Sequence, residues 1–79
     1  LIKLDKNIVW SSFKNEKAGI ALDSSIQMIK KLGFHIVAEG VETLEQAEKL
    51  SEMGCEYLQG YYYSKPLTQK NFLLYLEKK

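Results

Sequence analysis

Short apolar segments alternate with longer amphipathic segments along this chain, and this alternation constrains the fold more than any other feature. Strands are expected at residues 1–5, 34–38 and 56–61. Helices are expected at residues 17–32, from 43 to 53, and after residue 68. Strands that alternate with helices at this spacing predict a parallel sheet with right-handed crossovers. The expected fold is therefore α/β, in the order β-α-β-α-β-α.

Glycine and threonine residues mark the ends of the predicted helices. Gly33 follows the first helix and Gly54 follows the second, each where a C′ glycine is expected. Thr43 and Gln46 have the spacing of a capping box, in which both side chains satisfy free backbone N–H groups. Thr68 is the expected N-cap of the last helix.

The other expectations for local structure concern one loop and several apolar side chains. Residues 7–15 show a mixed pattern and are expected to form a loop with a short helical turn. In the first helix, Met28 and Leu32 are expected to widen a buried stripe formed by Leu22, Ile26 and Ile29. Leu44 is expected to begin the buried face of the second helix.

Composition excludes several classes of function. The 79 residues make one domain or a piece of one, and the net charge of +1 with no arginine argues against DNA or RNA as a partner. The apolar runs are too short to span a membrane, so no membrane contact is expected. The lone Cys55 cannot form an internal disulfide and fits a reducing, cytoplasmic location.

Polar side chains stand at or near the end of each predicted strand. Lys3 and Asp5 end the first strand, Glu39 and Glu42 follow the second, and Gln59 lies in the third. Because ligands bind at the carboxyl edge of parallel α/β sheets, this clustering predicts a site there. Three strands cannot close a barrel, so the two outer strands are expected to have open edges.

Three strings at the ends of these strands carry a family resemblance. They are IKLDK at residues 2–6, VAEGVET at 37–43 and QGYYYSKPL at 59–67. In this order and spacing they resemble the C-terminal part of the EAL family, the bacterial cyclic di-GMP phosphodiesterase domain of signal transduction. The resemblance implies a TIM-type (β/α)8 barrel of which this chain forms the last three βα units. Residues 1–79 are therefore expected to be a partial EAL domain, a C-terminal fragment.

The resemblance implies catalytic roles for two residues and a supporting role for a third. Lys3 matches the lysine beside the metal-bound water and the scissile phosphate. Glu39 matches the glutamate near the metal site, a general base or water-orienting group. Gln59 matches a glutamine that hydrogen-bonds within the metal–water site. The reaction implied is hydrolysis of cyclic di-GMP to the linear dinucleotide pGpG.

Four further residues complete the expected site. Glu42 and Asp5 are expected to support it, and Pro66 lies in a loop where a guanine base of the substrate packs in the family. Tyr61 is expected to contact the substrate, although aromatic residues at a strand end also serve as packing.

The metal site implied by the resemblance is incomplete in this sequence. The family uses Mg²⁺ or Mn²⁺, and most of its ligands precede the strand of the lysine; the Glu-Ala-Leu signature and the paired aspartates are missing here. The chain alone is therefore expected to hold no metal and to be inactive. The parent domain is either a phosphodiesterase or a degenerate, non-catalytic receptor or interaction domain. Open strand edges predict that the fragment self-associates.

Structural explanations remain open for several of these residues. Lys3 and Asp5 also fit an ion pair on a solvated strand face. Glu42 could also serve only to stabilise the following helix, because the helix dipole favours an acidic side chain near the N-terminus. His35, at the start of a strand, and Cys55 are expected to be structural.

Overall fold

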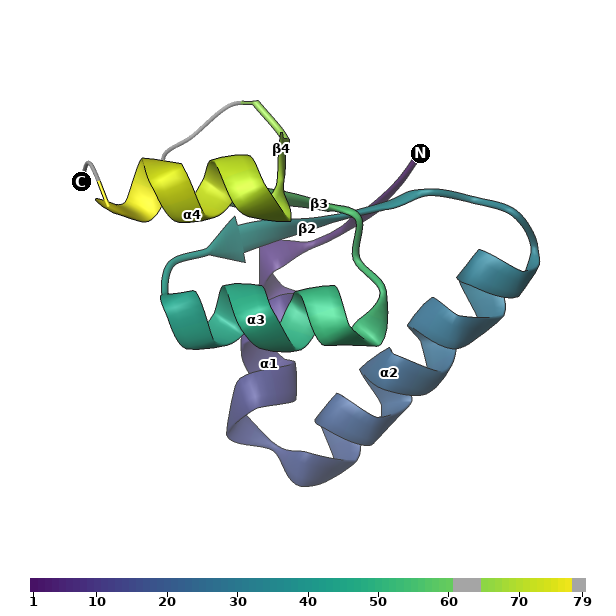
Figure 1. The fold of residues 1–79 in the computed structure, drawn as a ribbon. Helices are drawn as coiled ribbons and strands as arrows, with labels where there is room; N and C mark the ends of the chain where they lie inside the picture. The colour runs from purple at the N-terminus through teal and green to yellow at the C-terminus, as the bar shows by residue number, and fades with distance from the viewer. Residues whose placement is uncertain (61–64, 78–79) are drawn as a thin grey trace.

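A four-stranded sheet forms the centre of the computed structural model, which describes residues 1–60 and 65–77. The strand order is β1-β2-β3-β4 (Figure 1). Its strands are β1 (Ile2–Leu4), β2 (Ile36–Val41), β3 (Tyr57–Gly60) and β4 (Leu67–Thr68). The first three are parallel, as predicted, whereas β4 pairs antiparallel with β3. Strand β4 was not predicted from the sequence; it covers part of the β3 edge.

Helices connect the parallel strands and follow the last one (Figure 1). They are α1 (Lys6–Lys14), α2 (Glu16–Lys31), α3 (Leu44–Met53) and α4 (Gln69–Glu77). The predicted alternation of strands and helices is confirmed. The connection between β1 and β2 differs from the prediction because it holds two helices rather than one.

The prediction of a loop at residues 7–15 was wrong, because most of this segment is helix α1. Asp5 caps the helix, and its Oδ1 accepts a hydrogen bond from the Asn7 N–H at 2.7 Å. At the other end, Asn15 caps α2, with its Oδ1 accepting from the Ala18 N–H at 3.2 Å. Val9 is the one fully buried residue of α1, and Phe13, four residues later, is half-buried.

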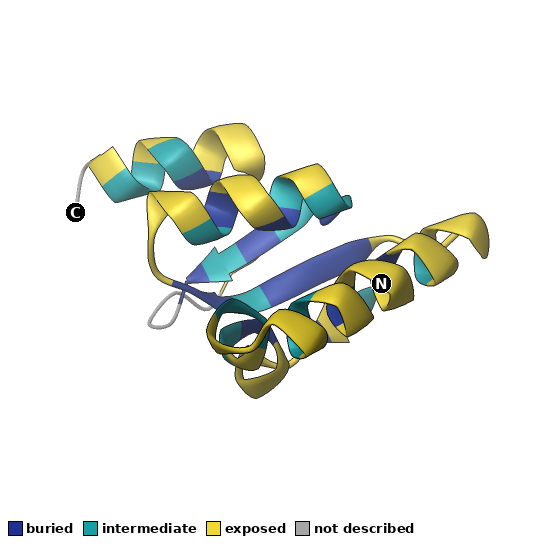
Figure 2. Cartoon of the chain, turned by 90° about the horizontal axis from the view of Figure 1, so that it is seen from below, coloured by how far each residue is buried: buried dark blue, intermediate teal, exposed yellow. Residues whose placement is uncertain are grey.

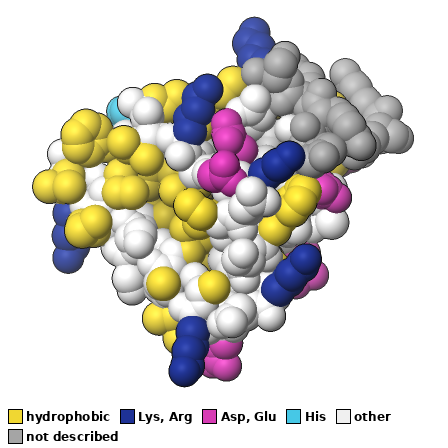
Figure 3. Space-filling view, turned by 180° about the vertical axis from the view of Figure 1, so that it is seen from behind, with side chains coloured by type: hydrophobic (Ala, Val, Ile, Leu, Met, Phe, Trp, Pro, Cys, Tyr) yellow, Lys and Arg dark blue, Asp and Glu magenta, His cyan; other side chains and the backbone are white. Residues whose placement is uncertain are grey.

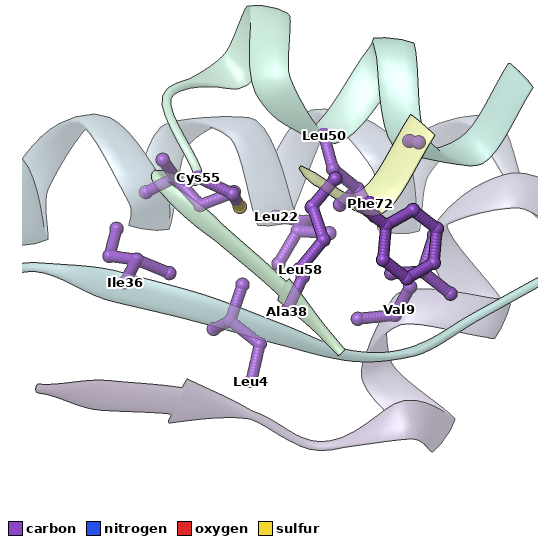
Figure 4. Packing of buried hydrophobic residues seen from close by; sticks show 12 residues of the cluster. Leu4, Val9, Leu22, Ile36, Ala38, Leu50, Cys55, Leu58 and Phe72 are labelled. Atoms are coloured by element: carbon purple, nitrogen blue, oxygen red, sulfur yellow. The ribbon is translucent and has the colours of Figure 1, made fainter. Parts of the chain in front are cut away.

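A single apolar core lies between the helices and the sheet. Figure 2 shows that burial is concentrated in the strands and on the sides of the helices that face them. Figure 4 shows Leu58 of β3, Leu50 of α3 and Phe72 of α4 converging in this core. All three side chains are fully buried. The core therefore joins the last helix to the sheet.

Three apolar side chains that were expected to be buried are exposed. Met28 of α2 is 58% exposed, Leu32, the C-cap of that helix, is 66% exposed, and Leu44 of α3 is 53% exposed. Of the residues of α2, only Leu22 and Ile26 are buried. Met28 is two residues beyond Ile26, a rotation of about 200° around the helix, and therefore points away from the sheet.

Capping agrees with the sequence in most respects. The Gln46 N–H donates to Thr43 Oγ1 at 3.1 Å, and Gly54 ends α3 in a left-handed conformation. Thr68 Oγ1 accepts from the Asn71 N–H at 3.4 Å. The second half of the expected capping box is displaced by one residue, since Gln46 Oε1 accepts from the N–H of Glu42 rather than that of Thr43.

Candidate functional site

The alternation of side chains along the strands divides the sheet into two faces. Leu4, Ala38 and Leu58 are register partners on adjacent strands, and all three belong to the core between the sheet and the helices. Their neighbours Lys3 and Val37 are also register partners, and successive side chains on a strand point to opposite faces. Lys3 therefore lies on the face away from the helices.

Glu39 and Gln59 lie on this same face, closer to the carboxyl edge. Glu39 is two residues beyond Val37, and Gln59 is two residues beyond Tyr57, which is the register partner of Val37. Lys3 is exposed, whereas Glu39 and Gln59 are half-buried. The fold thus brings together, on three adjacent parallel strands, an ammonium, a carboxylate and an amide that are far apart in the sequence.

Strand β2 contains a bulge immediately after the candidate carboxylate. Ala38 pairs with Leu58 and Val41 pairs with Gly60, so β2 has one residue more than β3 in this interval. Gly40 takes up the difference with a left-handed φ of 75°. The extra residue leaves Val41 in the core with Ala38, although uninterrupted alternation would have placed it on the face of Glu39.

Helix α1 approaches this bulge closely enough to require glycine. A Cβ atom on Gly40 would lie 2.5 Å from the Cβ of Lys6 and 3.2 Å from Nε1 of Trp10. The indole N–H of Trp10 donates a hydrogen bond of 2.8 Å to the carbonyl oxygen of Gly40. The glycine between the two glutamates of VAEGVET is therefore explained by a positive φ and by the passing helix. Neither Trp10 nor this contact was predicted from the sequence.

One atom of the Gln59 amide lacks a hydrogen-bond partner within the described part of the chain. Its Oε1 is buried and has no hydrogen-bond partner among the residues that the structure describes. A buried acceptor without a partner costs about 1–3 kcal/mol, so such an atom is usually found next to a water, an ion or a ligand group. Gln59 Oε1 therefore fits a position that receives a donor or a cation from outside these residues.

The remaining predicted site residues lie around these three side chains or outside the described part of the chain. Asp5 is exposed and caps α1, which gives it a structural function in addition to any supporting one. Glu42 is exposed and lines a groove of about 230 Å³ together with Trp10 and Gln46. Pro66 is half-buried directly before β4. Tyr61 lies outside the described residues.

Charged side chains also meet at the opposite, amino-terminal edge of the sheet. His35 Nδ1 lies 2.5 Å from Glu56 Oε2, and Lys30 Nζ lies 3.7 Å from Glu56 Oε1. The hydrogen bond from His35 is the main cause that lowers the pKa of Glu56, with a smaller contribution from Lys30. Nearby, burial raises the pKa of the Cys55 thiol to about 12. These groups stabilise the strand starts, far from the candidate site.

The described residues do not by themselves form a metal site. No group of three or more His, Cys, Asp or Glu side chains is arranged to hold an ion within residues 1–60 and 65–77. Glu39 and Gln59 have oxygen atoms of the kind that hard divalent cations bind. Mg²⁺ binds six ligands, of which several are commonly waters and phosphate oxygens, and these two side chains could supply two of the six.

The sequence matches a known protein family and several characterised relatives. The family model of the EAL domain matches residues 1–66. The cyclic di-GMP phosphodiesterase PdeL of Escherichia coli is 42% identical over 72 residues, which cover 91% of this chain and 20% of that protein. The cyclic di-GMP phosphodiesterase RocR of Pseudomonas aeruginosa is 35% identical, with coverage of 94% and 19%. The chain thus spans about a fifth of the length of these relatives.

Solved structures of the same kind match the fold. The EAL enzyme Bd1971, in the form with cAMP and cyclic di-GMP bound, aligns with a TM-score of 0.71 and 30% identity over 94% of this chain and 20% of that chain. An EAL domain protein from Listeria monocytogenes aligns with a TM-score of 0.69 and 34% identity over 98% of this chain and 31% of that chain. The expected fold class, βα units of a TIM-type barrel, is confirmed. In the described part of the chain, no helix has the length and apolar character to cross a membrane.

Proposed function

The chain belongs to the EAL domain family, and we propose on this basis that it forms the C-terminal part of a domain that hydrolyses cyclic di-GMP to pGpG. The observation that carries the proposal is the convergence of Lys3, Glu39 and Gln59 on one face of three adjacent strands. The proposed substrate, cyclic di-GMP, is the one given in the names of the relatives PdeL and RocR. The amide oxygen of Gln59, which has no hydrogen-bond partner within residues 1–60 and 65–77, supports a polar occupant at this position.

Each of the three side chains has a role that follows from its chemistry. Negative charge grows on the phosphoryl oxygens during attack by water, and the Lys3 ammonium stabilises that charge where it develops. The Glu39 carboxylate orients the attacking water or accepts its proton. Gln59 Oε1 accepts a hydrogen bond from the same water or from a group of the substrate. Glu42 and Asp5 support the loops around them, and Pro66 and Tyr61 contact the base.

A divalent cation, Mg²⁺ or Mn²⁺, belongs to the proposed site. Such an ion lowers the pKa of a bound water and neutralises phosphate charge. Because the described residues contain no group of three or more His, Cys, Asp or Glu that could hold an ion, we propose that the chain alone is inactive and that further ligands belong to other parts of a complete barrel. A cytoplasmic location is consistent with an intracellular nucleotide substrate and with the reduced Cys55.

The test is to replace Lys3 with Ala in the full-length protein that carries this chain. We expect kcat for metal-dependent hydrolysis of cyclic di-GMP to fall by roughly 100-fold or more, the scale found when one group that stabilises transition-state charge is removed. Lys17→Ala, an exposed lysine at the start of α2, is the matched control and should leave kcat unchanged. Unchanged hydrolysis in Lys3→Ala would refute the catalytic assignment. Binding of cyclic di-GMP without hydrolysis by the wild type would instead identify a receptor.

We also propose that the isolated chain pairs with a second copy through the β1 side. Since β4 covers part of the β3 edge, β1 is the outer strand that offers a full unpaired edge within the described sheet. Beside it, Leu4, Ile8 and Leu22 line an apolar groove of about 480 Å³ between α1 and α2. Figure 3 shows the molecule from behind relative to Figure 1. Hydrophobic side chains gather on one side of this view, with charged groups around them.

Light scattering of the isolated chain tests this association. We expect a dimer at micromolar concentration, and we expect Ile8→Lys to shift it toward monomer because it places a charge in the groove. Ile20→Lys, which alters an exposed isoleucine outside that groove, is the control and should leave the dimer intact. A folded wild-type monomer at this concentration would contradict the proposal.

A further inference from the structure

The hydrogen bond between Trp10 and Gly40 joins two strand ends of the candidate site. Helix α1 begins at Lys6, directly after the strand that carries Lys3, and Asp5 caps its first turn. Trp10 lies one turn further along α1 and donates its indole N–H to the carbonyl oxygen of Gly40 at 2.8 Å. Gly40 in turn follows Glu39 in the sequence. The bond therefore connects the helix that follows β1 to the Gly40–Val41 peptide, one residue after the candidate carboxylate, across 30 residues of sequence.

The position that receives this bond lies where the pairing of β2 with β3 is irregular. A bulge places one residue outside the regular ladder of hydrogen bonds between strands, and glycine is the residue with the greatest backbone freedom. Gly40 has both properties, with its φ of 75° and the register change between Ala38 and Val41. The regular ladder with β3 therefore stops at Ala38 and resumes at Val41, so Glu39 lies in the irregular interval between two paired residues.

The contacts around Trp10 restrict the orientation of its indole ring. The side chain is half-buried and packs against the core, and the ammonium of Lys6 lies over its ring at 5.8 Å from the ring centroid. Lys6 Cβ also limits the space above Gly40, as shown by its 2.5 Å distance from an added Cβ. The ring cannot turn away without leaving these contacts, so its N–H fixes the orientation of the Gly40 carbonyl.

We propose that Trp10 is a positioning residue that holds Glu39 in its working orientation relative to Lys3. The inference rests on the proposed function, because it assigns a reaction to Glu39. Trp10 does not touch the reacting atoms; it acts through the bulge. Loss of its N–H would leave the strand paired and the core filled, while allowing the Glu39 carboxylate to move relative to the end of β1.

The test replaces Trp10 with Phe in the full-length protein, which keeps an aromatic ring and removes the N–H. We expect kcat for cyclic di-GMP hydrolysis to fall about 10- to 100-fold, the scale of a displacement of about 1 Å, with KM changed less than about twofold. Phe13→Leu changes a partly buried aromatic residue on the same helix that packs against the core, and it should leave kcat unchanged. Equal losses in both variants, or full activity in Trp10→Phe, would overturn the inference.

A second measurement does not depend on activity. The indole N–H signal that is absent from the NMR spectrum of Trp10→Phe belongs to Trp10, and its exchange with deuterium should be slow in the wild type. The backbone amide signals of Glu39 and Gly40 should shift in Trp10→Phe and stay in place in Phe13→Leu. Fast exchange with unshifted amides would refute the positioning role. If the wild type hydrolyses no cyclic di-GMP, the proposed function fails, and these signals still decide whether Trp10 holds the bulge.

Discussion

Substitution of Gly40 by alanine tests the close contact between α1 and the bulge. Two separate costs are expected. The first is conformational, because the φ of 75° lies in the left-handed region that residues with a Cβ avoid. The second is steric, because the new Cβ would lie 2.5 Å from the Cβ of Lys6. A Cβ atom cannot rotate away from the backbone, so α1 itself would have to move.

The structure sets the scale of these costs. The left-handed conformation costs about 1–2 kcal/mol, and an added atom in a packed contact costs about 1–3 kcal/mol. Together they predict a loss of roughly 2–5 kcal/mol in the free energy of unfolding. A domain of 79 residues has a total stability of about 4–12 kcal/mol at ordinary values per residue. Gly40→Ala is therefore expected to remove a large share of the stability.

The matched control is Gly33→Ala. Gly33 also has a positive φ, of 88°, but an added Cβ would meet no atom within 4 Å. It should show the conformational cost alone, about 1–2 kcal/mol. Urea unfolding followed by circular dichroism gives both values, at equal protein concentration because association changes apparent stability. If Gly40→Ala costs no more than Gly33→Ala, the contact with α1 does not constrain the bulge.

Two further predictions concern the amino-terminal edge of the sheet. The pKa of Glu56 is lower in the folded chain than the ordinary value of 4.5, so its contribution to stability is present above that pH and is lost as the pH falls through the lowered pKa. His35→Ala removes the main cause and should flatten the fall in urea midpoint below pH 4.5; identical acid profiles would count against this pairing. The Cys55 thiol, with its pKa raised from 9.0 to about 12, should react more slowly, by roughly 10-fold or more, with a thiol reagent at pH 8 in the folded than in the urea-unfolded chain, and equal rates would contradict its burial.

Much of the fold could be predicted because its signals are local. Thr43 and Thr68 are capping residues within three positions of the N–H groups that they accept from. The positions of Lys3, Glu39 and Gln59 also followed from the sequence, because parallel strands align their carboxyl ends at one edge. Each of these inferences needed only the strand or helix period and the residues beside it.

The parts that could not be predicted depend on contacts between distant residues. Helix α1 was not predicted, although Val9 and Phe13 have helical spacing, because its N-cap Asp5 was assigned to the end of the preceding strand. The β4 strand has two residues and exists through its pairing with β3. The bond from Trp10 to Gly40 has no local signal in the sequence, because the two residues are 30 positions apart and approach only when α1 and β2 pack together.

Gly40 is the one residue by which β2 exceeds β3 between their paired residues. In the gene, this bulge corresponds to one inserted codon. Its removal would give β2 and β3 equal lengths between their paired residues and would still leave Val41 facing the core. The same deletion would take away the carbonyl that Trp10 binds and the flexible peptide next to Glu39. A deletion of this codon would therefore leave the sheet paired and alter the site. The fold requires the pairing of this strand, whereas the site requires the extra glycine.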